Sequence, residues 1–231
     1  MAKIRAVVTD IEGTTSAIAF VKEVLFPFAE AALDGFLDAH ASDAPVAAIL
    51  AEVPGRDRRA TLRRWMAEDA KVAPLKSLQG LIWRSGFEDG RLHGNLWPDV
   101  APCLRAWARA GLTLAVYSSG SVEAQRLLFR HSVAGNLEGL FDGFFDTRIG
   151  AKREAPSYAA IAAALNCPPG EILFLSDVAE ELDAAQASGL RTCQLVRGED
   201  GTIGAGRHPE APDFPSVAVR FGLPYPSASA G

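Results

Sequence analysis

The sequence between Leu112 and Val196 alternates between segments typical of strands and segments typical of helices. This alternation limits the fold more than any other feature, because strands joined through helices run parallel in one sheet. An apolar run from Ile4 to Val8 adds a buried strand near the start of the chain. We therefore predict an α/β fold with a doubly wound parallel sheet. The later strands are expected at residues 112–117, 141–146, 172–175 and 192–196, with helices between them at 122–131, 157–165 and 180–187.

Residues 16–98 lie between the first strand and the rest of the sheet, and their apolar residues recur at helical spacing. Pro27 falls inside this pattern and should kink or split a helix. No segment of this block is typical of a strand, so we predict an all-helical insertion at 16–98 and a core made of residues 1–15 and 99–231. Further helices are expected to start near Asp43-Ala44-Pro45 and to span 58–70 and 75–87.

Two other segments complete the expected core. Asp99 is expected to cap a helix that ends at Gly111. From Gly198 onward the sequence is rich in Gly and Pro, with one short strand expected at Val217–Arg220. The last residues, 226–231, are expected to fray.

The first strand ends in two acids, Asp10 and Glu12, followed by Gly13 and two threonines. Chemistry in open α/β sheets gathers at the carboxyl ends of the strands. Two acids at such a point can bind a divalent cation, and one of them can attack an electrophile that the cation holds. For an isolated pair of acids, the alternative is a strand-end turn that is capped by Asp10.

The second strand is followed by a turn of small hydroxyl residues, Ser118-Ser119-Gly120-Ser121. Such a turn before a helix suits an anion, because backbone N–H groups and hydroxyls point outward at the helix N-terminus. A simple helix cap by Ser119 or Ser121 is the alternative, and it is compatible with phosphate binding.

The next two strand ends carry a lysine and another acid. Lys152 follows the third strand and can neutralise a phosphate and an attacking carboxylate, although a lone lysine is more often an exposed surface residue. Asp177 follows the fourth strand and can complete a cation site with Asp10. At least one of three nearby acids is expected only to favour the helix dipole. These acids are Glu180, Glu181 and Asp183.

In a parallel sheet these strand ends meet at one edge. The chemistry they indicate is phosphoryl transfer to a carboxylate, with Mg²⁺ and a lysine offsetting the charge. The expected partner is therefore a small-molecule phosphate ester.

Composition excludes several other classes of function. The net charge of −5 argues against general binding to nucleic acid or to an anionic membrane. The 3 cysteines lie far apart, at positions 103, 167 and 193, as expected for reduced thiols in a cytoplasmic protein. No signal peptide or bilayer-spanning apolar run is present, and the H-E-x-x-H and G-x-S-x-G motifs of zinc and serine hydrolases are missing. We expect a cytoplasmic monomer.

The order of an acid pair, a Ser/Gly turn, a lysine and another acid resembles that of the haloacid dehalogenase superfamily of aspartate-nucleophile phosphatases. Their first motif is normally D-x-D-x-T, and here Glu12 stands in place of the second Asp. Longer motifs are similar to those of the acireductone-forming enolase-phosphatases of methionine salvage, and the similarity covers most of residues 4–196. These motifs are Asp10-Ile11-Glu12-Gly13-Thr14-Thr15, Ile18-Ala19-Phe20-Val21-Lys22, Leu25-Phe26-Pro27, Leu75-Lys76-Ser77-Leu78-Gln79-Gly80 and Tyr117-Ser118-Ser119-Gly120-Ser121-Val122-Glu123-Ala124-Gln125.

This resemblance implies a bifunctional, Mg²⁺-dependent hydrolase that enolises 2,3-diketo-5-methylthiopentyl-1-phosphate and then hydrolyses the enol phosphate to the acireductone. By the resemblance, Asp10 is the nucleophile, and Asp10, Glu12 and Asp177 form the metal site. Lys152 is catalytic and, with Ser118 and Ser119, holds the phosphate, while Glu12 is also the candidate acid or base. The helical insertion would be a cap that closes over the substrate. Its contacts with the methylthio end are expected from Phe20, Trp83 and the Leu75–Gly80 loop, although Trp83 equally fits the core of the cap.

Three alternatives remain at the level of sequence. Another phosphatase of the same superfamily would act on a sugar or nucleotide phosphate. A dehalogenase would share the nucleophile without a metal, against which Glu12 and Asp177 argue. A phosphoryl-accepting receiver domain would place its acceptor Asp on a middle strand and would lack the long helical insertion.

Overall fold

The structure is a computed structural model, and it describes residues 3–225 of the chain. Contacts within the chain divide it into two compact units. One unit contains the residues up to 18 together with those from 94 onward, and the other contains residues 19–93.

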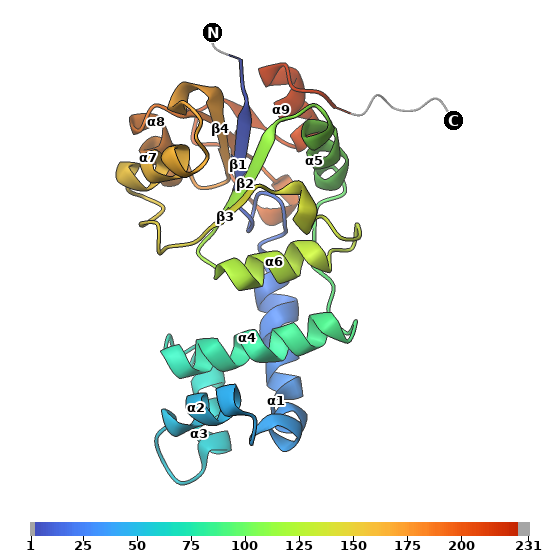
Figure 1. The fold of residues 1–231 in the computed structure, drawn as a ribbon, viewed down its shortest axis with the longest axis vertical. Coiled ribbons are helices and arrows are strands. Elements are labelled where there is room, and N and C mark those ends of the chain that lie inside the picture. Colours follow the sequence, from blue (N-terminus) through green and yellow to red (C-terminus); the bar gives the residue numbers. More distant parts are fainter. Residues whose placement is uncertain (1–2, 226–231) are drawn as a thin grey trace, which may run out of the picture. The chain divides into compact units, whose positions relative to one another are not determined.

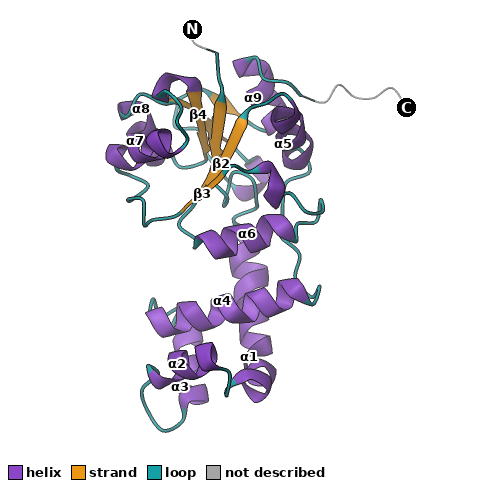
Figure 2. Cartoon of the chain, viewed as in Figure 1, coloured by secondary structure: helices purple, strands orange, loops and turns teal. Residues whose placement is uncertain are grey.

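The first unit is built on a 6-stranded sheet in the order β3-β2-β1-β4-β5-β6. Every neighbouring pair of strands is parallel, which confirms the doubly wound parallel sheet expected from the sequence. The alternation of helices and strands is visible in Figure 2. The strands are β1 Ala6–Thr9, β2 Thr113–Tyr117, β3 Gly143–Phe145, β4 Ile172–Ser176, β5 Arg191–Leu195 and β6 Glu210–Ala211.

Strand β1 lies in the middle of this sheet and is buried along its whole length. Its last residue, Thr9, pairs with Val116 of β2 on one side and with Leu175 of β4 on the other. The chain runs outward from β1 to β3 on one side and then returns to β4 on the other side. Ligands of doubly wound sheets bind at such a switch point, outside the carboxyl ends of the strands.

Helices cover both faces of the sheet, with α7 and α8 on one side and α5 and α9 on the other (Figure 1). On the first side, Tyr158 packs edge-on against Phe174, with ring centroids 5.0 Å apart. On the other side, Trp107 stacks on Phe214 at 5.4 Å. The α-helices of this unit are α5 Val100–Arg109, α6 Val122–Arg130, α7 Ala155–Ala164, α8 Ala179–Ala187 and α9 Phe214–Phe221, and the 3-10 helices are η2 Glu138–Leu140, η3 Pro169–Glu171 and η4 Gly198–Asp200.

The second unit, residues 19–93, is fully described and contains helices without a strand, as the sequence predicts. Its buried core is made of aliphatic side chains such as Leu33, Leu62 and Leu78. Pro27 lies in the first turn of α1, directly after a π-helix, so the helical pattern is split near the proline. The elements are the π-helix η1 Val21–Leu25, α1 Phe26–His40, α2 Ala44–Ala51, α3 Arg58–Ala67 and α4 Ala73–Glu88.

The observed boundary between the units lies a few residues inside the expected insertion. The reason is local hydrogen bonding, because the Ser16 hydroxyl and the Ala17 N–H both donate to Asn95. The backbone of Trp97 likewise donates to Thr15. These bonds hold residues 15–17 and 95–97 together within the sheet unit.

Three local expectations were wrong. Val217–Arg220 belongs to helix α9, which Asp213 caps by accepting from the Ser216 N–H. The segment Leu75–Gly80 lies within α4 instead of forming a loop. Asp99 precedes α5, but its side chain does not cap this helix, because its carboxylate binds Arg197. The expected fraying of 226–231 lies outside the described residues.

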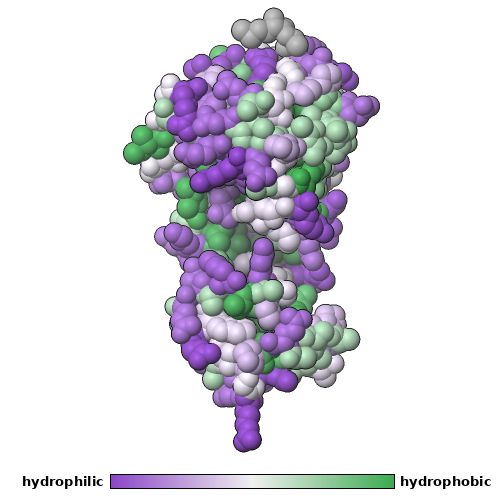
Figure 3. Space-filling view, turned by 90° about the vertical axis from the view of Figure 1, so that its left-hand side faces the viewer, coloured by the Kyte–Doolittle hydropathy of each residue, from purple (hydrophilic) through white to green (hydrophobic). Residues whose placement is uncertain are grey.

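No helix among residues 3–225 is both long and apolar enough to cross a membrane. The face of the molecule that is shown in Figure 3 mixes hydrophilic and apolar residues. Large apolar side chains that are exposed, such as Val133 and Ile203, lie far apart in the sequence.

Candidate active site

The polar strand ends predicted from the sequence meet at one edge of the sheet. Asp10 directly follows β1, Ser118 follows β2, and Asp177 follows β4. Because β2, β1 and β4 are neighbours, these three residues follow adjacent strands at the same edge of the sheet. Asp10 is held in the sheet by its own N–H, which donates to the Leu175 carbonyl at 2.9 Å.

Lys152 lies at the centre of this edge as a buried cation. It follows β3 and has a side chain only 11% exposed, so it is not the surface lysine of the alternative interpretation. Its Nζ is 2.7 Å from Oδ1 of Asp10 and 2.7 Å from Oε2 of Glu181. Burial lowers the pKa of Lys152, but the two carboxylates outweigh burial, and the net pKa is raised. Lys152 therefore remains charged.

The loop around Lys152 is fixed by two buried tyrosines. The Tyr158 hydroxyl donates to the Lys152 carbonyl at 2.7 Å, and the Tyr117 hydroxyl donates to the Gly150 carbonyl at 2.9 Å. Both tyrosines belong to the packed core between the sheet and α7. The position of the lysine is therefore set by the core.

Glu181 is the second partner of Lys152, and its carboxylate also accepts from the Ser176 hydroxyl at 3.0 Å. Burial and the nearby charge of Asp10 raise the pKa of Glu181 to about 7, against the lowering effect of Lys152. One lysine thus neutralises two acids that lie close together. Phosphoryl transfer to Asp10 would bring further negative charge to this place, so the arrangement requires additional positive charge.

Asp177 faces the loop that follows β1. Its N–H donates to Oγ1 of Thr14 at 3.0 Å, and the Thr14 hydroxyl lies 3.5 Å from Oδ1 of Asp177. Gly13, with φ +71°, makes this approach possible, because a Cβ added there would lie 2.4 Å from Oδ2 of Asp177. Burial and the charge of Asp10 raise the pKa of Asp177 to about 6.

These residues fit a divalent cation. Asp177 is mostly buried beside the like charge of Asp10, and both effects raise its pKa, whereas the charge of Lys152 lowers it. The donors that lie close together here are the carboxylate oxygens of Asp10 and Asp177. No group of three His, Cys, Asp or Glu side chains in the described part of the chain forms a complete metal site. A cation bound here would therefore have one or two carboxylate ligands and would take its other ligands from water.

The turn after β2 is also held in place. Ser121 caps α6 by accepting from the Ala124 N–H, and the buried Ser118 hydroxyl accepts from the Gly120 N–H. Ser119 is exposed beside them. The buried amide of Gln125 donates to the Gly120 carbonyl at 2.8 Å and so fixes the turn from inside the helix. The helix cap by Ser121 is confirmed, and the anion site at this turn remains a prediction.

The structure separates the three acids of α8 that the sequence left together. Glu181 enters the site, whereas Asp183 and Glu180 bind Arg207 at the surface. The sequence interpretation missed Glu181 as a site residue. Its spacing was a usable signal, because Ala185 lies one turn further along α8 and is buried.

The remaining expected site residues are Glu12, which follows β1, and Phe20 and Trp83 in the helical unit. The side chain of Glu12 is exposed, and its part in a metal site remains a prediction. In the helical unit, Phe20 is buried, and the Trp83 indole N–H donates to the Leu25 carbonyl at 2.8 Å. Trp83 also packs against the hydrophobic core of that unit. This contact favours the structural interpretation of Trp83.

A model of the haloacid dehalogenase-like hydrolases matches residues 4–189. The enolase-phosphatase E1 of Granulibacter bethesdensis is 60% identical over 227 residues, which cover 96% of this chain and 98% of that protein. The enolase-phosphatase E1 of Gluconobacter oxydans is 52% identical over 224 residues, with 96% and 99% covered.

Solved structures support the same fold. The UTR4 protein of Saccharomyces cerevisiae superposes with a TM-score of 0.81 at 31% identity, covering 92% of this chain and 99% of that one. A 2-haloacid dehalogenase from Pseudomonas syringae gives a TM-score of 0.59 at 21% identity, covering 94% and 99%. The second likeness concerns the fold alone.

Proposed function

Since the chain belongs to the haloacid dehalogenase-like hydrolases and, within them, to the enolase-phosphatase E1 family, we propose that it acts on 2,3-diketo-5-methylthiopentyl-1-phosphate. The chain is a phosphatase enzyme, and the proposed products are the acireductone 1,2-dihydroxy-3-keto-5-methylthiopentene and phosphate. This reaction belongs to methionine salvage. It consists of an enolisation followed by hydrolysis of the enol phosphate.

Asp10 is the proposed nucleophile of the hydrolytic step. Its carboxylate attacks phosphorus, the bond from phosphorus to the enol oxygen breaks, and an aspartyl-phosphate forms on Asp10. A water molecule then attacks this phosphorus, which releases phosphate and regenerates the carboxylate. The N–H of Asp10 is bonded within the sheet, so the nucleophile is presented from a rigid element.

Lys152 and the turn after β2 hold the charge that this step develops. The Nζ of Lys152 already lies 2.7 Å from the Asp10 carboxylate, which places it to stabilise both this carboxylate and the transferring phosphoryl group. Ser118 and Ser119 are the proposed phosphate contacts, at the N-terminal side of α6.

Mg²⁺ is the proposed cofactor, held by Asp10, Asp177 and the carbonyl of Glu12. When bound, it supplies a Lewis acid for phosphoryl and carbonyl oxygens and offsets the charge of the acids. Asp177 would contribute its carboxylate to this site. Thr14 and the close approach at Gly13 position this residue.

The enolisation needs a base close to the carbon that bears the phosphate ester. Glu12 is one candidate, and its side chain is exposed to solvent. Glu23, at the start of the helical unit, is a second candidate from its position in the chain. We propose the helical unit, residues 19–93, as the cap that limits the access of water to the enol intermediate.

The observation that carries this proposal is the buried contact between Lys152 and Asp10 at the end of the central strand. A carboxylate and a lysine in this position, beside a further acid and an anion-binding turn, have the properties that phosphoryl transfer requires. A metal-independent dehalogenase would not need the second acid, Asp177.

The test follows the two half-reactions separately in the presence of Mg²⁺, with ultraviolet absorbance for the enol and a phosphate assay for hydrolysis. Asp10→Asn should abolish phosphate release and accumulate the enol phosphate, and EDTA should stop both steps. Asp177→Asn should weaken both steps, whereas Asp183→Asn is a matched control at the surface of α8. Near-normal phosphate release by folded Asp10→Asn would refute the mechanism, and faster turnover of sugar or nucleotide phosphates would refute the substrate.

A further inference from the structure

Arg197 is a buried cation that the proposed chemistry does not use. It follows β5, and its side chain is 5% exposed. Its guanidinium lies over two aromatic rings, with its central carbon 5.3 Å from the centroid of Trp97 and 5.7 Å from that of Phe214. Such stacking is favourable for arginine and fixes the plane of its guanidinium.

Every N–H of this guanidinium has a partner. Nη1 and Nη2 donate to the two oxygens of Asp99 at 2.9 and 3.0 Å. Nε and Nη2 donate to the Thr14 carbonyl at 3.3 and 3.0 Å, and Nη1 also donates to the Pro212 carbonyl at 3.2 Å. Arginine has five such hydrogens, so its donor capacity is fully used. Lysine cannot make this set of contacts, because it lacks the planar fork.

Thr14 is the residue through which Arg197 reaches the candidate site. The carbonyl of Thr14 is held by Arg197, and its hydroxyl is held against the backbone N–H of Asp177. Gly13 directly precedes Thr14 in the same turn. The bond from Arg197 to Thr14 therefore also fixes the turn in which the missing side chain of Gly13 allows Asp177 to approach.

Two neighbours of Arg197 make similar contacts to the same loops. The buried side chain of Gln194 donates to the Asp177 carbonyl at 2.8 Å. The carboxylate of Asp200 accepts from the Ile18 N–H at 3.0 Å. The segment from Gln194 to Asp200 therefore binds the loop after β1 and the loop after β4, which carry the two acids of the site.

We propose that Arg197 is a positioning residue for the divalent-cation site, which it orders by fixing Thr14 and, through Thr14, the carboxylate of Asp177. This inference rests on the proposed function. Residues that orient metal ligands without touching the metal typically change its affinity about 10–100-fold when they are replaced. Arg197→Lys should therefore raise the Kd for Mg²⁺ by about 10–100-fold.

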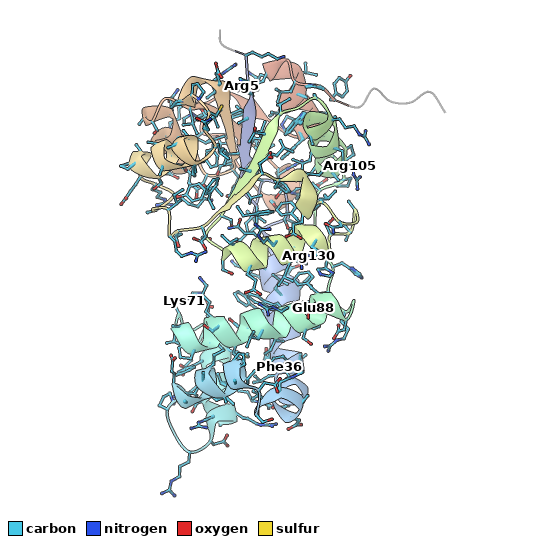
Figure 4. The ribbon with its side chains drawn as sticks, in the orientation of Figure 1. Arg5, Phe36, Lys71, Glu88, Arg105 and Arg130 are labelled. Carbon is cyan, nitrogen blue, oxygen red and sulfur yellow. The ribbon has the colours of Figure 1, made fainter. Side chains whose placement is uncertain are left out.

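The experiment titrates Mg²⁺ alone into the folded full chain by calorimetry, so its readout does not depend on catalysis. The matched control is Arg105→Lys, because Arg105 of α5 (Figure 4) also donates to a backbone carbonyl, that of Ala134, away from the site. Both substitutions remove an arginine contact, but only Arg197→Lys should weaken Mg²⁺ binding. Thermal unfolding of both variants separates a general loss of stability from this specific effect.

Asp99→Asn provides a second test that keeps the arginine. It removes the charge that holds Arg197 while retaining an oxygen acceptor, so the Kd for Mg²⁺ should rise by a smaller factor that still exceeds about twofold. A Kd for Arg197→Lys within about twofold of wild type would overturn the proposal, and if this variant does not fold, the same criterion applies to Asp99→Asn. Wild-type protein that neither binds nor needs Mg²⁺ would instead refute the metal site in the proposed function.

Discussion

Replacing Lys152 with methionine tests the electrostatics of the site most directly. Methionine matches much of the shape of lysine but leaves the carboxylates of Asp10 and Glu181, each 2.7 Å from Nζ in the wild type, without their shared cation. Removing one partner of a buried ion pair costs about 3–5 kcal/mol. We therefore expect Lys152→Met to lose about this much free energy of unfolding at about pH 8, and to lose phosphate release.

The loss should depend on pH in a defined direction. In the wild type the pKa of Glu181 is already raised from 4.5 to about 7. The folded state therefore binds this proton more tightly than the unfolded state. As a result, the contribution of Glu181 to the free energy of unfolding falls as the pH rises from about 4.5 to about 7.

Without Lys152 the pKa of Glu181 should rise further, because the lysine lowers it in the wild type. The variant then continues to lose stability above the pH at which the wild type levels off. We expect the stability difference between the two proteins to be larger at about pH 8 than at about pH 5.5, by about 1–2 kcal/mol.

Urea unfolding at both pH values, with a phosphate assay on the same samples, measures these effects. Adding Glu181→Gln to Lys152→Met removes one of the two carboxylates that are left without a cation. The double variant should recover part of the stability that Lys152→Met loses, but none of the phosphate release. An unfolding free energy of Lys152→Met equal to that of the wild type at about pH 8 would refute the reasoning. Recovery of phosphate release by the double variant, Lys152→Met with Glu181→Gln, would also refute it.

Three other substitutions address the loops of the site. Gly13→Ala should cost about 1–2 kcal/mol for the left-handed backbone, and phosphate release should fall sharply because the new Cβ would displace Asp177; a variant with wild-type stability and activity in urea unfolding and phosphate assays would contradict this. Ser121→Ala should cost about 1 kcal/mol, through loss of the α6 cap, with little change in kcat/KM. Ser119→Ala should behave in the opposite way, lowering kcat/KM for the phosphate substrate about 10–150-fold at unchanged stability, since a hydrogen bond to a charged group is worth about 1.5–3 kcal/mol; equal kinetics of the two serine variants would remove Ser119 from the phosphate site.

The fold class and the location of the candidate site followed from the sequence. Apolar strands that alternate with helices specify a parallel sheet, and polar residues directly after those strands must lie at one edge of it. That is why Asp10, Lys152 and Asp177 could be grouped before their positions were known. Local backbone chemistry also sufficed for Gly13, which has a positive φ in the structure.

Helix faces and the tail were less predictable, because short segments carry weak periodic patterns. The segment Val217–Arg220 fits either a strand or a helix, and the cap at Asp213 makes it part of α9. The side chain of Asp99 could cap the helix that follows it or bind a distant cation. The structure shows the second, since Arg197 is buried and needs a counter-charge.

Only the tertiary structure decided which charged residues enter the site. Glu180, Glu181 and Asp183 look alike in the sequence, and the packing of α8 against the sheet buries Glu181 alone beside Lys152. The bond from Arg197 to Thr14 joins residues 183 positions apart. Periodicity and motif spacing describe near neighbours along the chain, whereas burial and ion pairing depend on surfaces that meet only after folding.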